Sequence, residues 1–149
     1  MKKLLPPLIL STLSISSAIA SPTLQELPKQ QPGKAAFMIY SSTLRATSTY
    51  DYYVNNEKVG TIEGDKVKLI YLEPGEYKVN VNVPYSSAPL TKTVNVTAGK
   101  YYFMNAYTTL SGKHTMLTTY HLENVEENAA LAYLQNSNKN SLKWYEITL

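Results

Sequence analysis

The stretch EYKVNVNV, residues 76–83, decides the fold class. Its apolar side chains are Tyr77, Val79, Val81 and Val83, and polar residues stand between them. Successive side chains of a strand point to opposite faces, so a period of two with polar partners predicts a strand with one buried face. This alternation favours a sheet protein that has a covered side and a solvent-facing side.

The residues on either side of this stretch predict neighbouring strands. Pro74-Gly75 fits a type II turn, because proline presets φ at the second position and glycine accepts a positive φ at the third. We expect this turn to join residues 66–72 and 76–83 as a hairpin. On the other side, strands are predicted at residues 93–96 and 100–107, with a turn at Ala98-Gly99 between them.

Short segments rich in Tyr, Val, Ile and Thr recur through the rest of the chain. Asn55-Asn56 separates strands at residues 50–55 and 58–62 and predicts a second hairpin. Further strands are expected at residues 36–40, 114–122 and 144–147, and the acidic start and helical spacing of residues 124–134 predict one helix that docks on a sheet. The fold class is mostly β: an Ig-like or prealbumin-like antiparallel β-sandwich with one short C-terminal helix.

The first twenty residues have the layout of a secretory signal peptide: a charged start, an apolar stretch and the small-residue ending Ala18-Ile19-Ala20. A membrane anchor is the weaker interpretation, because prolines and hydroxyl residues interrupt the roughly 20 apolar residues that a spanning helix needs. Residues 21–34 hold three prolines and predict a flexible lead-in, and residues 35–149 predict a single domain. We therefore expect a periplasmic or secreted protein with no integral membrane segment after cleavage.

Composition bears on the class of partner. The chain has no cysteine, so we expect no disulfide, no thiolate metal site and no lipid anchor. Without Lys2 and Lys3, 12 basic side chains remain against 11 acidic ones, and the lysines stand singly. A nucleic-acid binder normally carries a basic stripe, so no nucleic-acid partner is expected.

No motif for catalysis, cofactor binding or metal binding stands out. His114 and His121 are the only histidines, and a separation of seven places them on opposite faces of a regular strand. The G-x-S-x-G elbow, the G-x-G-x-x-G loop and the Walker pattern are all absent. We expect no enzyme, no cofactor and no metal site.

Tyrosine is the most informative residue type, with thirteen copies against two phenylalanines and one tryptophan. In Tyr52-Tyr53 and in Tyr101-Tyr102, one ring of each pair must leave the core face, because adjacent strand residues face opposite ways. Such rings are either covered by the helix and terminal segments or exposed as a surface that binds partners. The candidate partner surface therefore consists of Tyr52, Tyr53, Tyr101 and Tyr102.

Four runs carry a resemblance: YYVNNEKVGTI (52–62), LEPGEYKVNV (72–81), KTVNVTAGKYYF (92–103) and HLENVEENAALAYL (121–134). They resemble a bacterial domain-of-unknown-function family of small envelope proteins and lipoproteins with a PEGA-like or prealbumin-like β-sandwich. The resemblance covers roughly residues 36–135 and rests on turn chemistry and strand periodicity. It implies an envelope location and brings no catalytic residue with it.

Three functions remain open. The leading hypothesis is a non-catalytic envelope domain that binds or scaffolds a protein or glycan partner through a sheet edge or a tyrosine-bearing face. The second is a small outer-membrane β-barrel, which uses aromatic girdles and strands of about ten residues. The third is a hydrolase that acts on envelope polymers, for which the sequence offers no traceable site.

Overall fold

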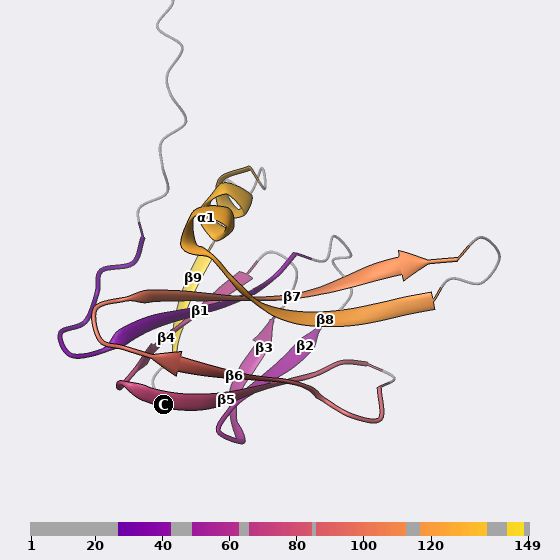
Figure 1. Ribbon diagram of the computed structural model, residues 1–149, viewed down its shortest axis with the longest axis horizontal. Coiled ribbons are helices and arrows are strands. Elements are labelled where there is room, and N and C mark those ends of the chain that lie inside the picture. Colours follow the sequence, from indigo (N-terminus) through magenta and orange to yellow (C-terminus); the bar gives the residue numbers. More distant parts are fainter. Residues whose placement is uncertain are drawn as a thin grey trace, which may run out of the picture.

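The computed structural model describes residues 27–42, 49–62, 66–84, 86–112, 117–136 and 143–147. Within these ranges the chain forms nine strands and one helix (Figure 1). In chain order they are β1 (Ala35–Ser41), β2 (Tyr50–Val54), β3 (Glu57–Ile62), β4 (Lys66–Leu72), β5 (Gly75–Asn82), β6 (Leu90–Val96), β7 (Tyr101–Ser111), β8 (Leu117–Val125), α1 (Glu127–Asn136) and β9 (Lys143–Ile147). The predicted signal peptide lies outside the described residues.

The strands form two sheets. The four-stranded sheet has the order β3-β2-β5-β6 and is antiparallel throughout. The five-stranded sheet has the order β8-β7-β1-β4-β9, in which the pairs β1–β7 and β4–β9 are parallel. The predicted mostly β sandwich with one short helix is confirmed, with these two parallel pairs as an addition to the predicted antiparallel pattern.

The alternation in β5 builds the core between the sheets. Val79 and Val81 are fully buried, whereas Lys78 between Tyr77 and Val79 is exposed. Every strand from β1 to β8 contributes buried apolar side chains to this inter-sheet core. Burial of apolar area contributes about 25 cal/mol per Å², so this shared core is the main stabilising term of the domain.

A second cluster lies on the other face of the five-stranded sheet, where α1 packs. Ala130 and Leu134 of α1 are buried against β1, β4 and β7. All seven residues of β1 are buried because this strand lies between the inter-sheet core and α1. A helix of 10 residues is marginal in water, so α1 depends on this docking, as the sequence predicted. No helix in the described ranges is long and apolar enough to cross a bilayer.

The boundaries of the last described elements differ from the prediction. The strand expected at residues 114–122 is β8, which continues to Val125, and the helix expected at residues 124–134 begins at Glu127. Asn124 and Val125 extend β8 because they pair with Met104 and Phe103 of β7. Residues 113–116, and His114 with them, lie outside the described residues.

The predicted hairpin at Pro74-Gly75 is wrong. β4 pairs with β1 and β9, whereas β5 pairs with β2 and β6, so this connection crosses from one sheet to the other. Gly75 is the first residue of β5 with φ at 157°, and a type II turn needs about +80°. Pro74 therefore follows the end of β4 and Gly75 begins β5 in the other sheet, and they do not form a hairpin turn.

The predicted hairpin at Asn55-Asn56 is confirmed. Both residues have positive φ, 49° and 69°, as a type I′ turn requires, and Val54 pairs with Glu57 across it. A two-residue loop can only join antiparallel neighbours, so local chemistry determines the pairing of β2 with β3.

The end of the predicted flexible lead-in contacts the five-stranded sheet. The Tyr101 hydroxyl donates to the carbonyl oxygen of Pro28 at 2.8 Å, and the Tyr71 hydroxyl donates to that of Lys29 at 2.6 Å. Leu27 packs beside the helix-side cluster. Residues 27–34 therefore lie along the domain from which the prediction separated them.

Candidate functional site

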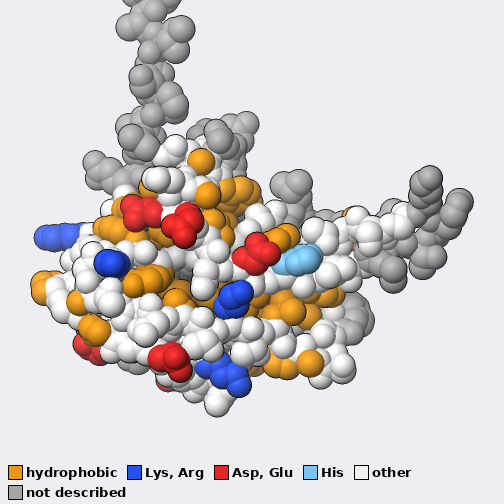
Figure 2. Space-filling view, in the orientation of Figure 1, with side chains coloured by type: hydrophobic (Ala, Val, Ile, Leu, Met, Phe, Trp, Pro, Cys, Tyr) orange, Lys and Arg blue, Asp and Glu red, His pale blue; other side chains and the backbone are white. Residues whose placement is uncertain are grey.

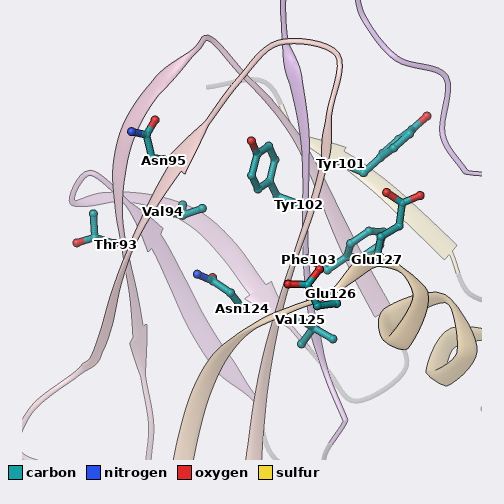
Figure 3. Close-up of a pocket in the computed structure, with 10 residues that line it drawn as sticks. All are labelled: Thr93, Val94, Asn95, Tyr101, Tyr102, Phe103, Asn124, Val125, Glu126 and Glu127. Carbon is teal, nitrogen blue, oxygen red and sulfur yellow. The ribbon is translucent and has the colours of Figure 1, made fainter.

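A cleft of about 400 Å³ lies where the two sheets meet α1. It is formed by the second half of β6, the start of β7, the end of β8 and the start of α1 (Figure 3). Its lining residues are Thr93, Val94, Asn95, Tyr101, Tyr102, Phe103, Asn124, Val125, Glu126 and Glu127. The cleft thus joins segments that are about thirty residues apart in the sequence.

The hydrogen-bond pattern of β5 determines which side of β6 is open. The backbone N–H of Asn55 donates to the carbonyl oxygen of Lys78 at 2.8 Å. Residues of an antiparallel strand direct their backbone groups alternately to one neighbour and the other, so Lys78 and Asn80 bond toward β2. Tyr77 and Val79 therefore bond toward β6.

The partners of these residues on β6 are Val94 and Lys92, whose N–H and C=O groups are used in the β5–β6 ladder. Thr91, Thr93 and Asn95 alternate with Lys92 and Val94 along β6, so their backbone N–H and C=O groups point away from β5. No strand in the described part of the chain pairs with β6 on that side. We call these outward groups of Thr91, Thr93 and Asn95 the open edge of β6.

At the start of β7, Tyr101 has no described strand paired with it on the side away from β1. Ala36 of β1 donates its N–H to the carbonyl oxygen of Lys100 at 3.0 Å, and Ala36 is paired with Tyr101 in the parallel ladder. In such a ladder the N–H and C=O of Tyr101 point away from β1. On that side β8 ends at Val125, opposite Phe103, so β7 extends past its neighbour at the cleft.

Tyr102 is held in a fixed orientation at this site. Its hydroxyl accepts the backbone N–H of Thr97 at 3.0 Å and lies 3.1 Å from the Thr97 hydroxyl. Its ring packs partly against the inter-sheet core and projects between β6 and β7 in Figure 3. The hydroxyl thus bonds to Thr97 of the same chain, and the ring forms part of the cleft wall.

The charge of the cleft is negative. Among the described residues that line it, Glu126 and Glu127 are the only acidic or basic side chains, and both are exposed. Figure 2 shows acidic side chains around the start of α1, whereas basic side chains are scattered singly on this face. Glu127 also stands in the first turn of α1, where a negative charge is favourable to the helix dipole.

The structure separates the four predicted tyrosines. Tyr52 is 1% exposed in the inter-sheet core, so its inclusion in a partner surface was wrong. Tyr53 lies half-buried on the outer face of the four-stranded sheet. Tyr101 and Tyr102 are the two that come together, on opposite faces of β7 beside the same cleft.

His121 lies outside the cleft on β8. Its ring stacks on Tyr107 with centroids 4.7 Å apart, and its Nε2 lies 2.9 Å from the Thr109 hydroxyl. Among the residues that the structure describes, no group of three or more acidic or histidine side chains is arranged to hold a metal ion.

The sequence interpretation missed the open edge of β6 and the two glutamates. The outward direction of Thr93 depends on the partners of β5, which no local pattern reports. Glu126 and Glu127 belonged to the acidic start of the helix predicted at residues 124–134, and in the structure they directly follow β8 and line the cleft. Their adjacent negative charges were the one signal in the sequence.

A scan against protein-family models finds no match, and a search of the curated proteins finds none either. The case for a function therefore depends on the open edge of β6 and the cleft beside it.

Proposed function

We propose that this chain is a non-catalytic, exported domain of the bacterial envelope that binds an extended segment of another protein by strand addition to the open edge of β6. The observation that carries the proposal is this edge, unpaired and beside a cleft. The predicted signal peptide and the resemblance to envelope proteins support the location.

Edge strands usually carry a device that prevents unwanted pairing, such as a lysine. β6 carries Lys92 in its first half, and Thr93 to Asn95 in its second half have no charge. The second half of β6, which has no charged side chain, is the half that borders the cleft. This arrangement favours selective pairing at one end of the strand.

Strand addition uses two kinds of contact. Backbone hydrogen bonds to Thr93 and Asn95 supply affinity, and the alternate side chains of the added strand enter the cleft and supply selectivity. Tyr101, whose backbone groups point away from β1, also lines this cleft. A protein partner is favoured over a glycan because these groups have the spacing of a strand.

The test is a photo-cross-linking residue at Asn124, which is exposed and lines the cleft, in the producing organism. We expect one dominant protein product, which Thr93→Pro abolishes because proline removes the outward N–H without removing a β5 ladder bond. Thr93→Val retains that N–H and should retain the product. A cross-linker at Glu57, on the opposite edge strand β3, is the matched control.

Three results would contradict the proposal. The first is that cross-linkers at Asn124 and at Glu57 capture the same protein. The second is that the product from Asn124 still forms in the Thr93→Pro variant, and the third is that the cross-linker at Asn124 gives no product. Circular dichroism and the urea midpoint of Thr93→Pro should match those of Thr93→Val, which establishes that both variants are folded.

A further inference from the structure

We infer that the side chain which the bound strand places in the cleft is a lysine or an arginine. This inference rests on the proposed function and names the chemistry of the partner segment. The two carboxylates of Glu126 and Glu127 are its first support, because no described basic side chain lines the cleft to neutralise them.

The aromatic wall is an independent second support. A cation is attracted to the face of a tyrosine ring within about 6 Å, and Tyr102 lines the cleft with its ring held by two hydroxyl contacts to Thr97. Because this orientation exists before binding, the partner does not have to order the ring. The carboxylates stand on the α1 side of the cleft, away from the Tyr102 ring (Figure 3).

The apolar lining suits the stem of a long basic side chain. Val94 in the second half of β6 is buried, and Val125 at the end of β8 is half-buried. Lysine and arginine cover such surface with their methylene groups and keep the charged head near water. Carboxylates, an aromatic ring and apolar walls together fit a basic side chain better than a neutral or acidic one.

The experiment uses three short, capped peptides of alternating threonine and valine that differ only at the central residue, which is Lys, Gln or Glu. Binding to the full domain is measured by fluorescence polarisation at about 50 mM salt, where screening is weak. We expect the Lys peptide to bind about fivefold more tightly than the Gln peptide, the scale of a favourable exposed ion pair, and the Glu peptide to bind most weakly.

The double variant Glu126→Gln/Glu127→Gln should lose most of the preference for the Lys peptide and keep only the part that the Tyr102 ring supplies, with affinity for the Gln peptide unchanged. Glu57→Gln removes an exposed carboxylate on the opposite edge strand and should leave the preference intact. A preference that this double variant retains in full overturns the inference.

The two proposals fail in different ways. Equal binding of all three peptides, abolished by Thr93→Pro, overturns the basic side chain and leaves strand addition standing. No binding, or binding unaffected by Thr93→Pro, overturns strand addition itself. A dimer in sedimentation that Thr93→Pro dissociates would assign the open edge to a second copy of this chain and overturn both proposals.

Discussion

The Tyr50 hydroxyl gives a direct test of the inter-sheet core. Tyr50 is 1% exposed, and its hydroxyl oxygen is buried with no hydrogen-bond partner among the described residues. An unsatisfied buried polar group costs about 1–3 kcal/mol, and Tyr50→Phe removes the hydroxyl while keeping the ring that fills the core. We expect this variant to raise the free energy of unfolding by about 1 kcal/mol.

Urea unfolding followed by circular dichroism measures this change, with an unaltered m-value as evidence that the same surface is buried. Tyr52→Phe is the matched control, since the Tyr52 hydroxyl donates to the carbonyl oxygen of Tyr40 at 3.4 Å. We expect it to lower the free energy of unfolding by less than about 1 kcal/mol, because the bond is long. A loss of stability in Tyr50→Phe as large as that in Tyr52→Phe would refute the conclusion that the Tyr50 hydroxyl is buried without a hydrogen-bond partner.

Three further predictions concern the helix, the tight turn and an exposed ion pair. Leu134→Ala should lower the free energy of unfolding, measured in urea, by about 2–3 kcal/mol, because Leu134 is 4% exposed on the face of α1 that packs on the five-stranded sheet. Ala132→Ser, on the exposed face of α1, should change it by less than about 0.5 kcal/mol. Asn56→Gly should leave the thermal midpoint unchanged or raise it, and Asn56→Val should lower it, because φ is 69° at this position. The hydroxyl of Thr61 and the side chain of Lys58 lower the pKa of Asp51 from 3.8. Asp51 therefore stabilises the fold above its ordinary pKa, and this stabilisation is lost as the pH falls through the lowered value. In urea unfolding at a series of acidic pH values, Asp51→Asn should make the free energy of unfolding depend less on pH.

Strand positions could be predicted from the sequence where local chemistry determines them. The alternation of Val79 and Val81 identified β5 because one of its faces is buried against the other sheet. Asn55-Asn56 identified its hairpin because two residues with positive φ leave no other connection. Both predictions use information contained within a few residues.

Sheet membership could not be predicted in this way. Pro74-Gly75 looks the same in a hairpin and in a crossing between sheets, and only the partners of β4 and β5 distinguish them. The cleft has the same origin, since β6, β7, β8 and α1 meet only after both sheets have formed. Tyr101 and Tyr102 were identified as candidates because adjacent residues of a strand point to opposite faces. The same rule does not say which ring of a pair is buried, so the prediction that Tyr52 belongs to a partner surface was wrong.

Amide hydrogen exchange along β6 tests the central claim most directly. In the free domain we expect slow exchange at Lys92 and Val94, which bond to β5, and fast exchange at Thr93 and Asn95, which face the open edge. Saturation with the Lys peptide should slow Thr93 and Asn95 selectively. Equal protection of all four amides in the free domain, or fast exchange at Thr93 and Asn95 in the complex, would contradict the account.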